Sequence, residues 1–390
     1  MLMTKIILKN WKNFQDLELP FRERAFIVGP NASGKSNLLD AIRFMRDIVK
    51  QAGGFQYAVA RRGGVAKIRC LSARQDSNAT LEIHLSHSFS DVHPEWQYRL
   101  SFRHAGGGIR RSEGLILEEV ICKQGEIIGE RHNTDSIEED DWKFTLLEQP
   151  VSNKKFREIY DFFKDIQYLH VVPQLIREAD SYVLTSGRED FYGRNLLEAM
   201  AKKNANTRES YFNRINQFLK IAVPQLEEMK FVSDQKTGIP HLQATYKHWR
   251  AKGAKQQEKQ FSDGTLRLVG FLWAILDGSG LLLLEEPELY LHSAIIKQMA
   301  EYIARFQRKR DKSLRQVFIT THSYELLDNQ GIGSDELIVL RTDSESTQAQ
   351  IGSEVKEIRD YLDKGFSPAE AVIPYVAPKQ VEQLSLLKED

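Results

Sequence analysis

The spacing of apolar residues predicts an N-terminal group of strands followed by a helix. Residues 4–28 hold three short apolar segments of strand length. Residues 37–50 place Leu, Ile and Met three or four positions apart, as one buried helix face requires. Strict alternation of apolar and polar residues at 81–86 and 97–103 then predicts half-buried antiparallel strands. We therefore expect strands on both sides of the first helix.

The later chain changes from a helical pattern to alternating helices and strands. Residues 151–230 have mainly helical spacing. The alternating part that follows is predicted as a helix at 264–277, a strand at 281–285, a helix at 292–308, a strand at 316–320 and a helix at 323–328. Such alternation is typical of an α/β fold with parallel strands.

Composition fits a globular protein with a sizeable core. The 390 residues are 41% apolar and 28% charged, with equal totals of basic and acidic residues. A net charge of zero excludes a protein that is basic overall, although it leaves room for a local basic strip. Two cysteines without a C-x-x-C pair argue against a zinc ribbon or a disulfide framework, and favour a reducing compartment. The longest apolar run, 268–276, is too short to span a membrane, so we expect a cytoplasmic protein.

A glycine-bearing loop is the first candidate site. Residues 29–36 read GPNASGKS, which is the pattern G-x4-G-K-S between a predicted strand and a predicted helix. In this arrangement main-chain N–H groups and a helix N-terminus surround phosphate oxygens. Lys35 would reach the outer phosphates and the Ser36 hydroxyl would bind Mg²⁺. A chance match in a turn is the competing interpretation, and the flanking elements make it weak.

Two carboxylates follow a buried strand. Residues 281–284 are four leucines, and Glu285, Glu286, Pro287 and Glu288 come next. Ligands of open parallel sheets bind at the carboxyl ends of the strands. One carboxylate there can hold Mg²⁺ and the other can act as a general base toward water. Alone, the pattern could equally be a buried strand and a solvated acidic turn.

Two further polar clusters lie at the start of a predicted helix and at the end of a predicted strand. Ser262 and Gly264 stand at the start of an apolar helix, where Ser262 is either a simple cap or part of a second anion site. The strand at 316–320 ends in Thr320, Thr321 and His322. A lone histidine is usually structural, but this one is expected on the strand beside the carboxylate strand.

In this order the four motifs resemble the ABC-class ATPases of the SMC, RecF and OLD group. The resemblance is strongest to standalone prokaryotic ATPases that share the motifs LSDGT-LR and EEPE-x-x-LH. It covers residues 1–50, including LKNWKNF at 8–14, and residues 255–340 well. The middle of the chain matches in layout only. The resemblance implies a two-lobed α/β ATPase head, with a mixed or parallel core sheet, an antiparallel β-meander and a helical insertion.

The resemblance divides this single head along the chain. Residues 1–125 would form the lobe with the phosphate loop and the meander. Residues 126–245 would be a mostly helical insertion. Residues 246–345 would carry the signature, the carboxylates and the histidine, and residues 346–390 would be a helical tail.

Family roles carry over to matching residues only. The ATP-binding residues would be Gly29, Asn31, Ser33, Gly34, Lys35, Ser36 and Asn37, with Ser262 and Gly264 contributed across a dimer interface. Glu286 would be the catalytic glutamate, acting with Lys35 and the switch histidine His322. Mg²⁺ would be bound by Ser36, Glu285 and, on a poor local match, Gln174. Glu285 replaces a more usual aspartate and His292 replaces another, which puts turnover and cross-dimer coupling in doubt.

The resemblance also suggests a biological role. Two copies would join head-to-tail around ATP and control a separate effector, a nuclease or toxin, in anti-phage defence. The alternative is a RecF- or SMC-like DNA-maintenance ATPase. A P-loop phosphotransferase and an ATP-binding scaffold with little turnover are weaker alternatives.

Nucleic-acid and metal binding outside the ATP site remain weaker interpretations. Arg61, Arg62, Arg99, Arg103, Arg110, Arg111 and the stretch 247–259 could form basic strips. Solvated charge is the commoner explanation, and weak salt-sensitive DNA or RNA contact is the other. His84 and His87 would face opposite sides of a strand, which argues against a shared metal.

Overall fold

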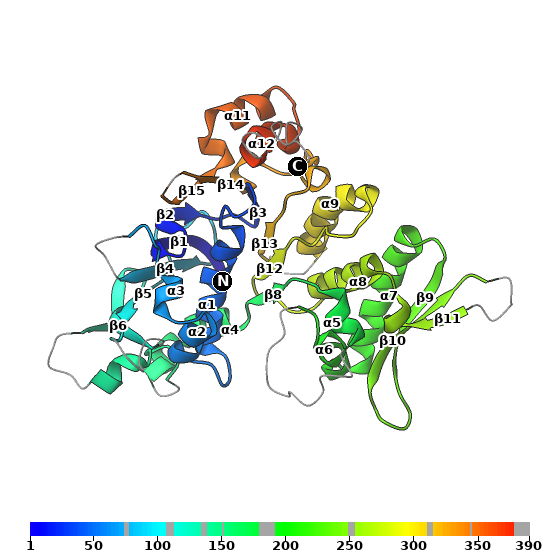
Figure 1. Ribbon diagram of the computed structural model, residues 1–390, viewed down its shortest axis with the longest axis horizontal. Coiled ribbons are helices and arrows are strands. Elements are labelled where there is room, and N and C mark those ends of the chain that lie inside the picture. Colours follow the sequence, from blue (N-terminus) through cyan, green and yellow to red (C-terminus); the bar gives the residue numbers. More distant parts are fainter. Residues whose placement is uncertain are drawn as a thin grey trace, which may run out of the picture. The chain divides into compact units, whose positions relative to one another are not determined.

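The structure is a computed structural model, and it describes residues 1–73, 78–106, 113–133, 139–149, 152–178, 192–248, 254–309, 315–343 and 345–377. The chain divides into two compact units (Figure 1). Unit 1 comprises residues 1–167, 279–283 and 313–390, and unit 2 comprises 168–278 and 284–312. Segments of the two units alternate along the chain, whereas the sequence analysis expected lobes made of consecutive residues.

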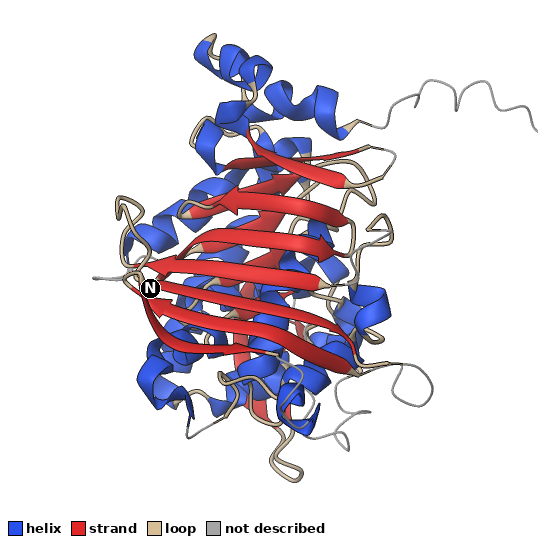
Figure 2. Cartoon of the chain, turned by 90° about the vertical axis from the view of Figure 1, so that its left-hand side faces the viewer, coloured by secondary structure: helices blue, strands red, loops and turns tan. Residues whose placement is uncertain are grey.

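Unit 1 contains an antiparallel sheet of six strands in the order β2-β1-β4-β5-β6-β7, seen from one side in Figure 2. These strands are β1 (Leu2–Trp11), β2 (Phe14–Pro20), β4 (Ala79–Ser86), β5 (Trp96–His104), β6 (Gly114–Lys123) and β7 (Glu126–His132). Ile6, Ile83, Tyr98 and Ile121 face one another across four neighbouring strands, and all four are buried. Their alternation with polar residues fixes which face of the sheet joins the core.

A second sheet has the order β15-β14-β3-β13-β12-β8. Its strands are β3 (Arg24–Val28), β8 (Gln167–Leu169), β12 (Leu282–Glu285), β13 (Val317–Thr320), β14 (Leu337–Thr342) and β15 (Thr347–Ile351). β3 runs parallel to β13 and β14, while β15 is antiparallel to β14. Residues 25–28 of β3 are all buried, as expected for a central strand covered on both faces. These two sheets confirm the predicted α/β class with its mixed core sheet and β-meander.

Helices complete unit 1. They are α1 (Lys35–Val49), α2 (Phe55–Arg61), α3 (Val65–Ile68), α4 (Arg157–Lys164), α10 (Tyr324–Leu327), α11 (Lys356–Asp363) and α12 (Pro368–Val376). The predicted helical face of α1 is buried, including Leu38, Leu39, Ile42, Met45 and Ile48. The tail expected to be helical begins with strand β15 before α11 and α12.

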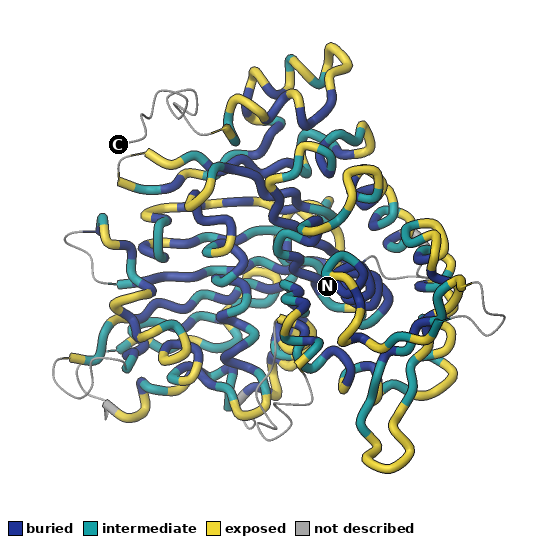
Figure 3. The backbone as a smooth tube through the Cα atoms, turned by 45° about the vertical axis from the view of Figure 1, so that its right-hand side comes forward, coloured by how far each residue is buried: buried dark blue, intermediate teal, exposed yellow. Residues whose placement is uncertain are grey.

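Unit 2 combines helices with a three-stranded antiparallel sheet in the order β11-β10-β9. Its elements are α5 (Pro173–Arg177), α6 (Leu196–Lys202), α7 (Ala205–Ala222), β9 (Leu226–Ser233), β10 (Pro240–Tyr246), β11 (Ala254–Gln257), α8 (Asp263–Leu276) and α9 (Ser293–Lys309). All residues of α8 from Thr265 to Leu276 are buried, and Figure 3 colours the backbone by burial. The segment 126–245 therefore holds helices together with β7, β8, β9 and β10, which the sequence analysis did not predict.

Candidate functional site

The phosphate-loop motif lies at the carboxyl end of β3. Residues 29–34 connect β3 to α1, so the loop follows a buried parallel strand and precedes a helix of 15 residues. This is the edge of a parallel sheet where ligands bind. The strand–loop–helix context expected from the sequence is therefore present.

Gly34 gives the loop its shape. It has φ of 97° and caps the N-terminus of α1, in the left-handed region that favours glycine. A Cβ atom at this position would lie 2.0 Å from Asn13 Nδ2. Any other residue at position 34 would be strained and would also push the loop off its neighbour.

The donors of the loop suit an anion. Lys35 is buried, and its Nζ donates to the carbonyl oxygens of Gly29 and Pro30, each at 3.0 Å. The side chain is thus folded along the loop beside the N-terminus of α1, whose first N–H groups lack helical acceptors. Ser33 Oγ is buried with no hydrogen-bond partner among the described residues, and Ser36 is exposed. These groups fit a phosphate ligand.

Asn13 supports the loop from the tip of the β1–β2 hairpin. Its Nδ2 donates to the Ser33 carbonyl oxygen at 3.0 Å and to Thr347 Oγ1 at 2.6 Å. Its Oδ1 accepts from Asn37 Nδ2 at 2.7 Å. One side chain therefore joins the loop, the first turn of α1 and strand β15. The sequence analysis used this hairpin only as a mark of family resemblance.

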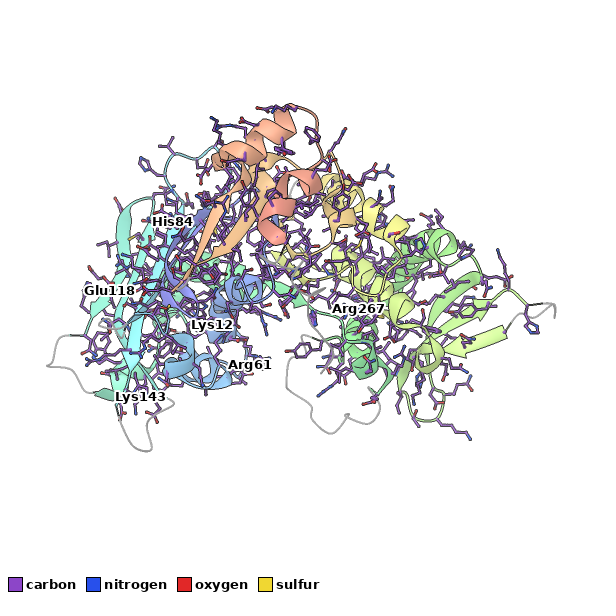
Figure 4. All side chains as sticks on the ribbon, turned by 45° about the horizontal axis from the view of Figure 1, so that its top comes forward. Lys12, Arg61, His84, Glu118, Lys143 and Arg267 are labelled. Atoms are coloured by element: carbon purple, nitrogen blue, oxygen red, sulfur yellow. The ribbon has the colours of Figure 1, made fainter. Side chains whose placement is uncertain are left out.

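Lys12, the neighbouring residue at the hairpin tip, is paired with α1 and is labelled in Figure 4. Its Nζ lies 2.6 Å from Asp40 Oδ2, and Arg62 Nη2 lies 2.8 Å from Asp40 Oδ1. Burial alone would raise the pKa of Asp40, but Arg62 and Lys12 lower the pKa to about 2. Arg62 also pairs with the buried Asp47 at 2.9 Å. These ion pairs hold α1 at two positions that lie about two turns apart.

His322 belongs to the same edge of the sheet as the loop. It follows β13, whose Thr320 lies opposite Ile27 of β3 in parallel register. The Thr321 N–H donates to the Ile27 carbonyl oxygen at 3.2 Å, and Ile27 is two residues before Gly29. His322 is exposed just beyond this pair. Within unit 1 the structure thus places the histidine motif and the phosphate loop on adjacent strands.

Glu285 ends β12, and its partners within unit 2 include Tyr168 of β8 and His170, which directly follows β8. Tyr168 donates its phenolic hydroxyl to Glu285 Oε2. His170 Nδ1 lies 3.2 Å from the Glu285 carbonyl oxygen. The sequence analysis missed both residues, although their segment immediately precedes the candidate Gln174. Gln174 itself is exposed on α5.

Glu286 adopts φ of 43°, a left-handed conformation that is uncommon for a residue with a side chain. Arg267, labelled in Figure 4, donates from Nη1 to its carbonyl oxygen at 3.4 Å. The Arg267 guanidinium also lies over the ring of Tyr290, 5.0 Å from its centroid. Burial lowers the pKa of Arg267 from its ordinary value. The carboxylate turn is therefore held against helix α8 within unit 2.

Ser262 and Gly264 form the first turn of α8. Ser262 Oγ accepts from the Thr265 N–H at 3.2 Å, so the predicted cap is present. A Cβ on Gly264 would lie 2.7 Å from the Tyr290 carbonyl oxygen. Asp263 pairs with Arg177 of α5. The turn consequently packs main chain to main chain against the segment that follows Glu286.

Several basic residues considered for nucleic-acid contact are engaged with carboxylates. Arg61 and Arg62 pair with Asp47, and Arg99 pairs with Glu118 at 3.2 Å. Arg103 is exposed, while Arg110, Arg111 and part of 247–259 lie outside the described residues.

The histidine pattern is also paired with acid. His84 Nε2 lies 2.6 Å from Glu82 Oε1. Within the described ranges no cluster of three or more His, Cys, Asp and Glu side chains could hold a metal. Mg²⁺ commonly keeps several waters and uses one or two carboxylates, so the single carboxylate of Glu285 is a chemically suitable ligand for it.

Comparison with known families decides the class of the chain. Residues 24–328 match the family model described as "AAA domain, putative AbiEii toxin, Type IV TA system". The chain belongs to this family. The match includes the phosphate loop, Ser262–Gly264, the carboxylates and His322.

Two curated relatives of this AAA-domain chain are named for DNA repair. The DNA double-strand break repair Rad50 ATPase of Thermoplasma acidophilum is 27% identical over 193 residues, which cover 43% of this chain and 19% of the relative. The DNA replication and repair protein RecF of Bacillus mycoides is 49% identical over 43 residues, covering 11% and 12%. The chain thus spans less than a fifth of either relative.

Solved structures show the same fold. An SMC head bound to the C-terminal winged-helix domain of ScpA has a TM-score of 0.55 at 16% identity, covering 90% of this chain and 98% of that one. An SMC head derived from Pyrococcus furiosus has a TM-score of 0.52 at 15% identity, with 93% and 99% coverage. The AAA-domain chain therefore has the fold of an SMC head, and its family match and curated relatives place its sequence with the ABC-class SMC, Rad50 and RecF proteins. In the part that the structure describes, no helix is long and apolar enough to cross a membrane.

Proposed function

We propose that this protein binds and hydrolyses ATP. The phosphate loop carries the proposal, because three of its groups are donors suited to phosphate oxygens. They are the buried Lys35 ammonium, the Ser33 hydroxyl, which has no hydrogen-bond partner among the described residues, and the N-terminus of α1. The residues assigned to the nucleotide are Gly29, Asn31, Ser33, Gly34, Lys35, Ser36 and Asn37. Mg²⁺ supplies charge neutralisation when bound, and Ser36 and Glu285 would hold it, with Gln174 as a further candidate.

Hydrolysis is assigned to Glu286 and His322. Glu286 would accept the proton of the attacking water, and His322 would orient groups near the outermost phosphate. Within unit 1 the strand order supports the assignment of His322, since β13 neighbours β3 and both motifs follow the carboxyl ends of their strands.

Two copies are proposed to associate head-to-tail around ATP. Ser262 of the partner subunit and the partner subunit's Gly264 would contact the phosphates held by Lys35. Support comes from the position of this turn at the N-terminus of a 14-residue helix, whose positive end favours an anion. ATP would then favour the dimer because it contacts both copies, and loss of the outermost phosphate would release them.

The ATP-driven dimer is proposed to control a separate effector protein, a nuclease or toxin. Support comes from the family description, which names a toxin and a toxin–antitoxin system. An anti-phage role follows from the same resemblance.

One substitution tests the catalytic and dimeric parts together. Glu286→Gln removes the base while keeping the size of the side chain, so turnover should fall 10²–10⁴-fold. The variant should also accumulate as an ATP-dependent dimer in light-scattering chromatography. Glu354→Gln, an exposed glutamate, is the matched control. A Glu286→Gln protein that stays monomeric at saturating Mg-ATP would refute the head-to-tail dimer.

The alternative is a DNA-binding ATPase, favoured by the Rad50 and RecF relatives. It requires basic surface, yet Arg62 and Arg99 are committed to carboxylates. A duplex-dependent rise in ATPase rate that disappears at high salt would support this alternative. ATPase activity indifferent to DNA, with no mobility shift at low salt, would exclude it.

A further inference from the structure

Glu285, the candidate metal-binding carboxylate, is contacted by strand β8 and the residue that follows it. Tyr168 is only 8% exposed and donates its hydroxyl to Glu285 Oε2. Two residues later, His170 Nδ1 lies 3.2 Å from the main-chain oxygen of the same glutamate. Both contacts lie within unit 2. Glu285 is therefore held at its side chain and at its main chain by one neighbouring segment.

The chemistry of these contacts fixes their direction. A phenol hydroxyl can donate, and an ionised carboxylate can only accept, so the proton lies on Tyr168. A hydrogen bond to a charged acceptor is stronger than a neutral one. His170 faces a carbonyl oxygen, which also only accepts, so its Nδ1 must carry a proton.

Glutamate needs such a support more than aspartate does. Its side chain has one additional rotatable bond, and its terminal carboxylate has a broad torsional minimum. A hydrogen bond at the tip removes that freedom before a cation arrives. Partners that orient metal-binding carboxylates commonly contribute 10–100-fold to metal affinity.

We propose that Tyr168 is a positioning residue that presets Glu285 for Mg²⁺, with His170 fixing the main chain beneath it. This inference rests on the proposed ATP-binding function. Tyr168 touches neither nucleotide nor metal in this scheme. Its removal should therefore change the Mg²⁺ requirement and leave metal-free nucleotide binding as it was.

The test titrates Mg²⁺ against the full-length protein with a fluorescent ATP analogue, reading bound nucleotide instead of turnover. Tyr168→Phe removes one oxygen and should raise the half-saturating Mg²⁺ concentration about tenfold. Its metal-free affinity for the analogue should equal that of wild type, which also shows that the variant is folded. Tyr160→Phe, on α4 in unit 1, is the matched control and should titrate as wild type does.

A second variant keeps the test decisive. Glu285→Asp withdraws the carboxylate by one methylene and should lose contact with the Tyr168 hydroxyl. It should raise the Mg²⁺ requirement, and adding Tyr168→Phe to it should have little further effect, because interacting residues are not additive. Fully additive shifts in the double variant would overturn the inference.

Other outcomes separate this inference from the proposed function. If Tyr168→Phe titrates as wild type does, or binds Mg²⁺ more tightly, while Glu285→Gln is impaired, Tyr168 does not preset the site and the ATPase proposal stands. If neither wild type nor Glu285→Gln responds to Mg²⁺, the proposed metal site itself fails, and the inference with it.

Discussion

The side-chain Nδ2 of Asn13 donates both to the Ser33 carbonyl oxygen at 3.0 Å and to Thr347 Oγ1 at 2.6 Å, so one amide links the phosphate loop to β15.

 The tip of the β1–β2 hairpin therefore supports the phosphate loop, and the tip is itself bonded to β15. Asn37 donates to the remaining oxygen of the same side chain at 2.7 Å.

Asn13→Ala should weaken ATP binding roughly tenfold, because the Ser33 carbonyl and the Asn37 amide both lose a half-buried partner. Asn13→Asp should be at least as impaired, since it places a negative oxygen against the Ser33 carbonyl. Equilibrium binding of a fluorescent ATP analogue measures both variants. Asn133→Ala also removes a side-chain bond to a main-chain oxygen of unit 1, that of Ile116, and is the matched control. Equal affinities for Asn13→Ala and Asn133→Ala would show that the hairpin tip does not shape the site.

Asp40 should make stability depend on pH in the acid range. Its pKa is lowered from 3.8 to about 2 in the folded protein, so the folded state favours the carboxylate. The resulting stabilisation, about 2 kcal/mol, is complete above pH 4 and is lost as the pH falls from about 4 to about 2. Asp40→Asn should lower the melting temperature at pH 6, and the deficit relative to wild type should shrink as the pH approaches 2.

Thermal melts of both proteins between pH 6 and pH 2.5 check this expectation. Asp363→Asn, on the exposed surface of α11, should show no such pH-dependent deficit. An Asp40→Asn deficit that grows with acidification would contradict the assigned ion pairs.

Gly264→Ala should separate nucleotide binding from dimer formation. The new methyl group would lie 2.7 Å from the Tyr290 carbonyl oxygen, so the first turn of α8 must move. We expect ATP-dependent dimerisation to weaken at least tenfold while one copy still binds ATP through Lys35. Sedimentation with and without Mg-ATP measures the dimer. Gly129→Ala, in β7, where the φ is not positive and a Cβ would lie 3.6 Å from its nearest neighbour, controls for the loss of a glycine. Wild-type dimerisation of Gly264→Ala would argue against this turn as an interface.

Local patterns were enough to predict the elements that carry the motifs. The helical spacing in α1, the apolar strand β12 and the cap at Ser262 each depend on residues close together in sequence. The structure confirms these elements, and the family match confirms the ABC-class resemblance. The roles of Glu286 and His322 stay predictions.

The three-stranded sheet of unit 2 was not predicted from the sequence, and the reason is physical. In β9 the fully buried positions are Leu226 and Met229, three residues apart, which imitates the spacing of a helix. The side chain of Asn216 on α7 also hydrogen-bonds to the Met229 main chain at 2.8 Å and 2.7 Å, and the local spacing of residues in β9 gives no sign of this contact. Contacts such as the one between Tyr168 and Glu285 join distant parts of the sequence, so no local sequence pattern predicts them.

The route of the chain has a practical consequence for dissecting this protein. The polypeptide passes between unit 1 and unit 2 at residues 167/168, 278/279, 283/284 and 312/313, and the third of these crossings falls inside β12. No single truncation can therefore release either unit intact. A fragment cut at the 283/284 boundary would also divide β12 and separate its first residues from Glu285, so point substitutions in the whole chain are the sound way to test the two units.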